Sequence, residues 1–108
     1  MNLENTKAQM RKGVLEFCIL SILSENEAYV SDLINKMKDS KLIVVEGTLY
    51  PLLNRLKNEE VLVYRWEESK SGPPRKYYKI TNKGKAMLHE LMQSWKELIE
   101  SVNSIITE

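Results

Sequence analysis

Apolar residues in the first sixty positions of the chain recur at helical spacing. Three helices are predicted, from about Lys7 to Ser24, from Tyr29 to Lys38, and from Glu46 or Gly47 onward. The third has the clearest pattern, because its apolar residues follow i, i+3, i+4 and i+7: Leu49, Leu52, Leu53 and Leu56. Pro51 fits this helix only within or just beyond its first turn, where backbone amides lack intrahelical partners.

After Val61 the spacing changes from helical to alternating. Leu62, Tyr64 and Trp66 share one face of a predicted strand, and Tyr78 and Ile80 share one face of a second strand. The Ser-Gly-Pro-Pro sequence between them predicts a β-hairpin whose connection, residues 69–74, is longer than a two-residue turn. Tyr64 and Trp66 are expected to pack this hairpin onto the helices.

A long final helix is predicted after Thr81, a suitable N-cap, and it continues to Ile106. Its apolar residues lie three and four positions apart over three heptads: Leu88, Leu91, Trp95, Leu98, Val102 and Ile105. This spacing is typical of a helix that packs along another helix, and no other segment is long enough to pair with it. We therefore expect its partner to be a second copy of the chain.

The order of these elements predicts the fold class: α+β, mostly α, a winged helix-turn-helix with a C-terminal dimerisation helix. Residues 1–83 are expected to form the winged helix-turn-helix, and residues 84–108 the dimerisation helix of the same compact domain. A chain of 108 residues, 43% hydrophobic and 29% charged, has the composition of one soluble globular domain.

Charge is distributed unevenly along the chain. The net charge is +1, yet residues 64–85 contain seven Lys or Arg against two Glu. Positive potential therefore gathers on the predicted hairpin. A helix followed by a basic hairpin suits a duplex, because the helix enters a groove while the hairpin lies along the phosphates. We expect residues 1–83 to bind double-stranded DNA.

The polar face of the third helix supplies the candidate groove contacts. They are Thr48, Tyr50, Pro51, Asn54, Arg55 and Lys57. Thr48 and Tyr50 can donate to phosphate or meet a thymine methyl group, and Asn54 can reach an adenine edge. The alternative is a polar face that is merely solvated. A second alternative for Tyr50 and Arg55 is that they brace the helix against neighbouring elements.

The tip of the hairpin supplies the candidate phosphate contacts, Lys70, Gly72, Arg75 and Lys76. Cations on a turn with little side-chain bulk can touch the backbone beyond the groove that the helix occupies. The alternative is an ordinary soluble turn.

Several classes of protein are disfavoured. The longest apolar run, Val14 to Leu23, contains Glu16 and is shorter than the ~20 residues of a membrane span, and no secretory signal is present. We expect a cytoplasmic protein with no membrane partner. The single histidine, His89, lacks the further His or Cys residues of a usual zinc site, and there is no Gly-rich phosphate loop. We predict no catalytic residue, no metal, no cofactor and no enzymatic activity.

Two separated motifs match a known family. The first is Gly47-Thr48-Leu49-Tyr50-Pro51 with Leu53, Arg55 and Leu56, and the second is Arg75-Lys76-Tyr77-Tyr78 with Ile80, Thr81 and Gly84. Together they resemble the PadR-like transcriptional regulators over nearly the whole chain. The length and the single C-terminal helix with Trp95 are most similar to the short subfamily, which includes a multidrug-binding repressor of lactic acid bacteria. The resemblance implies a homodimeric bacterial repressor.

The resemblance also implies a possible small aromatic effector. In the short subfamily, a tryptophan at the position of Trp95 lines a pore at the dimer centre and stacks on flat drugs. Trp95, Phe17, Met10 and Met92 are therefore candidate ligand contacts. The drug binder has a smaller aliphatic residue at the position of Phe17, so a ring from each subunit would fill part of the cavity. The alternative is that these residues form a packed dimer core.

These observations predict a homodimeric transcriptional regulator, a repressor, that binds an operator with dyad symmetry. The alternative function is a winged-helix protein-interaction module without specific DNA binding. Salt dependence separates the two, because affinity for a duplex falls linearly with the logarithm of salt concentration.

Overall fold

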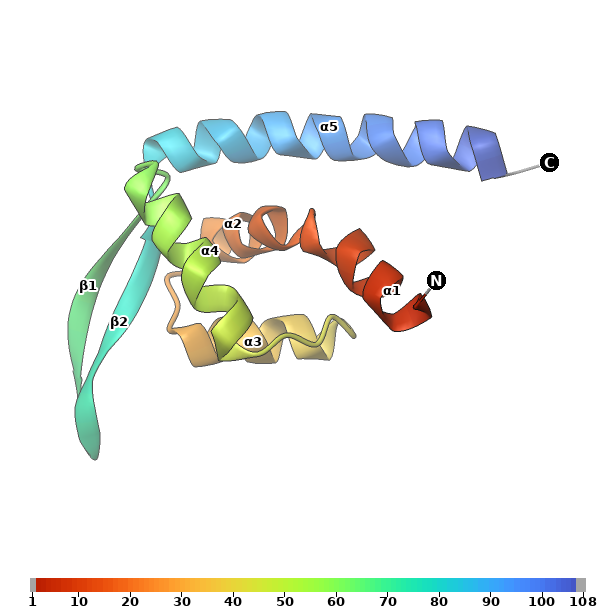
Figure 1. Ribbon diagram of the computed structural model, residues 1–108. Coiled ribbons are helices and arrows are strands. Elements are labelled where there is room, and N and C mark those ends of the chain that lie inside the picture. The colour runs from red at the N-terminus through yellow and green to blue at the C-terminus, as the bar shows by residue number, and fades with distance from the viewer. Residues whose placement is uncertain (1, 107–108) are drawn as a thin grey trace.

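The structure, a computed structural model, describes residues 2–106. Its elements, in chain order, are α1 (Leu3–Lys12), α2 (Leu15–Glu25), α3 (Val30–Asp39), α4 (Glu46–Asn58), β1 (Leu62–Ser69), β2 (Gly72–Ile80) and α5 (Asn82–Ile106). Figure 1 shows α2, α3 and α4 grouped together, the β-hairpin at one end, and α5 running along one side above α2 and α1. The predicted fold, a mostly helical winged helix-turn-helix with a C-terminal helix, is confirmed.

The predicted helix from Lys7 to Ser24 is in fact two helices, so that prediction was wrong. α1 ends at Lys12 and α2 begins at Leu15. At the break, the Val14 amide donates to the carbonyl of Arg11 at 3.1 Å, a bond over three residues. Gly13 and Val14 keep near-helical backbone angles, so the apolar spacing continues through the break. The break allows α1, none of whose residues is buried, to diverge from α2 (Figure 1).

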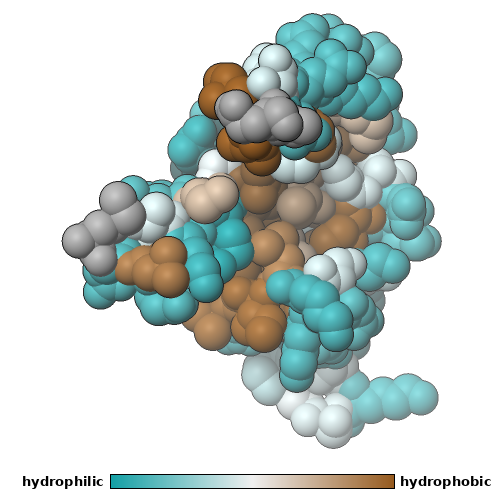
Figure 2. Space-filling view, turned by 90° about the vertical axis from the view of Figure 1, so that its right-hand side faces the viewer, coloured by the Kyte–Doolittle hydropathy of each residue, from teal (hydrophilic) through white to brown (hydrophobic). Residues whose placement is uncertain are grey.

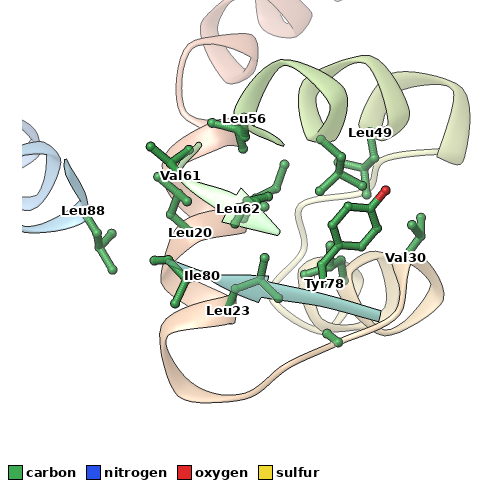
Figure 3. Packing of buried hydrophobic residues seen from close by; sticks show 14 of the residues in the cluster. Leu20, Leu23, Val30, Leu49, Leu56, Val61, Leu62, Tyr78, Ile80 and Leu88 are labelled. Atoms are coloured by element: carbon green, nitrogen blue, oxygen red, sulfur yellow. The ribbon is translucent and has the colours of Figure 1, made fainter. Parts of the chain in front are cut away.

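The hydrophobic core joins α2, α3, α4, the hairpin and the start of α5. The predicted stripe of α4 supplies three of its residues, Leu49, Leu53 and Leu56. In Figure 3 the ring of Tyr78, from β2, lies between the α4 side, near Leu49, and the α3 side, near Val30. Full burial of a side chain of this size stabilises the fold by about 1.5–3 kcal/mol. The core therefore fixes the hairpin relative to α4.

β1 and β2 pair in antiparallel fashion, and the loop between them is shorter than predicted. Ser69 pairs with Gly72, so the loop consists of Lys70 and Ser71. Pro73 and Pro74 belong to β2, next to a register irregularity between Glu67 and Ser69. Proline cannot donate to the ladder, and a bulge or an edge accommodates it. The expected longer connection was wrong because both prolines were assigned to the turn.

Two sets of hydrogen bonds join the hairpin to the helices. Ala28, just before α3, and Tyr78 exchange both backbone bonds, at 3.0 and 2.8 Å. The Thr81 hydroxyl accepts a bond from the Gly84 amide at 3.0 Å and donates to the Glu60 carbonyl at 2.7 Å. Thr81 is therefore the N-cap of α5, as predicted.

α5 extends well beyond the core. It has 25 residues, of which Gly84 and Leu88 are buried. The radius of gyration is 15.6 Å, against about 13 Å for a compact chain of this length. Among the described residues, no helix combines the length and the hydrophobicity needed to cross a membrane.

Candidate nucleic-acid interface

α4 presents one buried and one exposed side, which follows from its sequence. Leu49, Leu53 and Leu56 enter the core, and the polar residues between them face out. All six predicted groove contacts on this helix are exposed: Thr48, Tyr50, Pro51, Asn54, Arg55 and Lys57. By helical geometry, Pro51 and Asn54 lie near the centre of the exposed side, with Tyr50 and Arg55 on opposite flanks.

Pro51 is the sixth residue of α4, just beyond the first turn, as the sequence predicted. Its ring removes the amide that would donate to Gly47, four residues earlier, and a ring at this point normally crowds the carbonyl of that residue. Gly47 is exposed, and a Cβ there would meet no atom within 4 Å. The residue that faces the proline ring is therefore a glycine with no side chain to crowd it.

The hairpin places its four predicted contacts at two levels. Lys70 and Gly72 lie at the tip, and Arg75 and Lys76 lie further down β2. The Arg75 guanidinium stacks on the ring of Tyr29 at 4.2 Å, and the Lys76 ammonium lies over Tyr64 at 4.6 Å. Contacts of this kind hold a cation in place and leave its hydrogen-bond donors available.

A hollow of about 370 Å³ joins the hairpin to the start of α4. It brings together three of the predicted DNA contacts, Tyr50, Arg75 and Lys76. The other lining residues are Tyr29, Val30, Ser31, Glu46, Trp66 and Pro74. The tip residues Lys70 and Gly72 and the outward-facing Asn54 are not part of this lining. The hollow therefore brings three of the predicted contacts together, one from α4 and two from β2.

Trp66 was expected to pack the hairpin onto the helices, and this prediction was wrong. Its side chain is 61% exposed and forms part of the hollow. Trp66 pairs with Lys76 across the strands, and the ammonium lies 5.6 Å from its ring. Tyr64, two positions earlier on the same strand face, is half-buried and does face the core. Trp66, Tyr29 and Ser31 are therefore candidate contacts that the sequence interpretation missed.

Four of the five predicted cationic contacts form no ion pair in the part of the chain that the structure describes. Across residues 2–106, no carboxylate forms an ion pair with Lys57, Lys70, Arg75 or Lys76. Arg55 differs, since it pairs with Glu16 at 3.3 Å and Glu59 at 3.7 Å. This geometry favours the bracing alternative for Arg55. Unpaired cations are available to displace the counterions of a polyanion.

The base of this surface carries a buried phenol. Burial raises the pKa of Tyr78, and the neighbouring Tyr50 and Tyr64 raise it further. Tyr78 is therefore neutral at physiological pH, and its 1% exposed side chain acts as a packing residue beneath the interface.

The second predicted site is partly assembled within one chain. The rings of Phe17 and Trp95 lie 6.1 Å apart at 48°, and they line a hollow of about 140 Å³. Met10 and Met92 are exposed and lie outside that lining. A pocket for a drug-sized ligand usually measures about 300–1,000 Å³. The hollow of a single chain is therefore too small for such a ligand.

Comparison with known proteins identifies relatives of the whole fold. The model of the transcriptional regulator PadR-like family matches residues 19–90. A PadR-like transcription factor from Bacteroides fragilis is 62% identical, covers 94% of this chain and 98% of its own, and superposes with a TM-score of 0.79. A PadR-like regulator from Bacillus cereus is 44% identical, with coverages of 93% and 98% and a TM-score of 0.80.

A PadR family regulator from Eggerthella lenta is 31% identical, covers 97% of this chain and 92% of its own, and has a TM-score of 0.88. The resemblance read from the two sequence motifs is thus confirmed over the length of the fold. The chain belongs to the PadR-like family of transcriptional regulators, and its role is that of a DNA-binding regulator.

Proposed function

We propose that the protein is a repressor that binds, as a homodimer, an operator with dyad symmetry. α4 of each copy enters a major groove, and each hairpin lies along the flanking backbone or minor groove. The observation that carries this proposal is the shared surface on which exposed polar residues of α4 adjoin the unpaired cations of β2. Asn54 is the candidate base reader, while Arg75 and Lys76 are candidate phosphate contacts.

The dimer part of the proposal rests on α5. From Met92 to Ile106 the helix has seven large apolar side chains that are at least 37% exposed: Met92, Trp95, Leu98, Ile99, Val102, Ile105 and Ile106. Leu3 and Met10 of α1 add to them. Figure 2, which views the side where α1 begins and α5 ends, shows hydrophobic residues gathered between hydrophilic borders. A patch of this extent on a soluble domain marks an interface.

A second copy of the chain is the occupant that fits this patch best. The heptad spacing of α5 suits a partner helix of the same kind, and residues 84–108 then serve as the dimerisation helix. Two copies related by a two-fold axis would present their α4 helices about one turn of DNA apart.

Sedimentation and salt-dependent binding test the proposal directly. At micromolar concentration the protein should sediment as a dimer, and its affinity for duplex should fall with a slope near −0.9 per phosphate contact in log–log coordinates. A monomer at that concentration, with or without duplex, contradicts the dimer. An affinity for duplex that is independent of salt concentration supports the alternative, a protein-interaction module, instead.

A second candidate function, effector sensing, is supported by the Phe17–Trp95 contact at the edge of the apolar patch. In the dimer, two such hollows could join into one chamber for a planar aromatic compound. A ligand that changes operator occupancy tenfold must distinguish two dimer forms by about 1.4 kcal/mol. The test is titration of Trp95 emission in the Trp66→Phe variant with planar cations and phenolics. Unchanged emission at millimolar ligand contradicts this function.

A further inference from the structure

Arg55 differs from the other exposed residues of α4 because carboxylates hold its guanidinium. Nη1 lies 3.3 Å from Oε1 of Glu16, and Nε lies 3.7 Å from Oε1 of Glu59. Glu59 immediately follows α4, so that pair stays at one end of the helix. Glu16 belongs to α2, and its side chain is only 23% exposed. The pair with Glu16 is therefore a link between two helices.

Glu16 occupies a position from which it can connect α4 to the dimer helix. It lies in the first turn of α2, where a helix dipole favours a negative charge. The next residue, Phe17, contacts Trp95 of α5. α2 thus contacts α5 through apolar side chains, and this ion pair links it to α4 in addition to the core that the two helices share.

Packing alone does not fill the space around the pair. A hollow of about 550 Å³ lies between α1, α2, α4 and α5, and Glu16, Phe17, Leu52, Arg55 and Leu91 are among its lining residues. Closely packed side chains fix the angle between two helices, and a hollow removes such contacts from this side. The ion pair is therefore a direct link across an incompletely packed junction.

We propose that Arg55 is a positioning residue. Its ion pair with Glu16 holds the recognition helix α4 at a fixed angle to α2, and through α2 to the dimer helix α5. This inference rests on the proposed function, since a fixed angle matters when two recognition helices must enter successive major grooves together. Without the pair, the cations of the hairpin still bind phosphate, but α4 no longer meets the bases in one orientation.

Neutralising Glu16 separates this role from a direct DNA contact. Glu16→Gln should lower the preference for a selected duplex over a random duplex by about threefold to fivefold, the range expected for loss of a partly exposed ion pair. The probe is the shortest duplex that the wild-type protein selects from a random-sequence pool. Glu59→Gln is the matched control. It also removes one negative charge and one ion-pair partner of Arg55, but it leaves the ion pair between Arg55 and Glu16 of α2 in place. Its preference should change less than twofold.

Two further measurements, the salt slope and the tolerance of altered half-site spacing, distinguish the positioning role from a general loss of stability, which would change neither. Arg55→Gln should leave the salt slope unchanged, whereas a phosphate contact would reduce it by about 0.9. When one base pair is added to or removed from the centre of the selected duplex, Glu16→Gln should tolerate the change better than wild type. A reduced slope in Arg55→Gln, or a Glu16→Gln preference equal to that of Glu59→Gln, overturns the proposal.

A double-mutant cycle measures the link without DNA. Unfolding in urea of wild type, Glu16→Gln, Arg55→Gln and the double variant should show non-additivity of about twofold to fivefold in the unfolding equilibrium constant. Additive effects, with duplex selection intact, overturn the positioning role alone. If the wild type selects no duplex, the proposed function fails and the positioning role fails with it.

Discussion

Gly84, in the first turn of α5, lies directly against the backbone carbonyl of Val61. A Cβ at this position would overlap the carbonyl oxygen and would come within 2.7 Å of Cγ1 of Ile80. The same carbonyl accepts a hydrogen bond from the Thr81 amide at 3.1 Å. α5 therefore leaves the hairpin through a junction that has room only for glycine.

Gly84→Ala should destabilise the fold by about 1–3 kcal/mol, the usual cost of forcing an extra group into a packed site, because backbone must move to admit the methyl group. Urea unfolding followed by circular dichroism measures the loss. Gly13→Ala is the matched control, since a Cβ there meets no atom within 4 Å and its φ is −68°. That change should be neutral or stabilise by about 0.4–1 kcal/mol. Equal effects of the two substitutions would contradict the close approach at Gly84.

Thr81→Ala should lower the free energy of unfolding by about 1 kcal/mol. The substitution removes the cap bond from the Gly84 amide and the bond to the Glu60 carbonyl. Thr81→Ser keeps the hydroxyl and should retain most of the stability. Thermal unfolding of the three proteins gives the comparison, and a Ser variant as unstable as the Ala variant would show that the methyl group, not the cap, matters.

The paired substitution Arg75→Ala and Lys76→Ala should reduce the salt slope of duplex binding by about 1.8, because two phosphate contacts are lost. Fluorescence anisotropy at several salt concentrations measures the slope. Lys96→Ala, on the exposed surface of α5, removes a cation outside the interface and should leave the slope unchanged.

Asn54→Ala should act on sequence preference and not on the salt slope. Loss of an amide contact to a base edge costs about 1–3 kcal/mol on the preferred duplex and little on random duplex. Competition binding with the two duplexes measures the ratio. A uniform loss on both would indicate that Asn54 contacts backbone only.

Val102→Glu should convert the dimer to a monomer, because it buries a charge in the apolar patch of α5. Sedimentation velocity detects the change. Ser104→Glu introduces the same charge on the opposite side of the helix and should leave the dimer intact. A dimeric Val102→Glu protein would place the interface elsewhere.

Tyr78 should make the fold sensitive to alkaline pH. Burial raises its pKa above the ordinary value of about 10, so the folded state binds this proton more tightly than the unfolded state. The resulting stability is fully present below about pH 10 and is lost as pH rises through the folded pKa. The urea midpoint of Tyr78→Phe should therefore decline less steeply with alkaline pH than that of wild type.

Much of the fold could be predicted because local patterns encode it. The apolar stripe of α4, the alternation of β1 and the N-cap at Thr81 each depend on residues within a few positions of one another. The break at Gly13 could not be predicted, because the backbone there departs little from helical angles and the apolar spacing continues through it. A lone glycine in a helical pattern does not distinguish a break from a continuous helix.

The candidate site was less predictable because its contacts are not local. Arg75 stacks on Tyr29, and Arg55 pairs with Glu16, across long stretches of sequence. Trp66 shares a strand face with Leu62 and Tyr64, and burial falls along that face from Leu62 to Trp66, which alternation alone does not reveal. With a connection of residues 69–74, Trp66 would not be opposite Lys76, as it is in the observed register.

If the chain dimerises through α5 as proposed, the stability of the protein depends on its concentration. Among the described residues of α5, none after Leu88 is buried within the chain. The helix therefore gains most of its apolar stabilisation on association, so that folding and assembly share one free energy. The melting temperature should then rise as the protein is concentrated. In a cell, dilution by growth would weaken both the dimer and its resistance to proteolysis, so the regulator would be cleared once its synthesis stops.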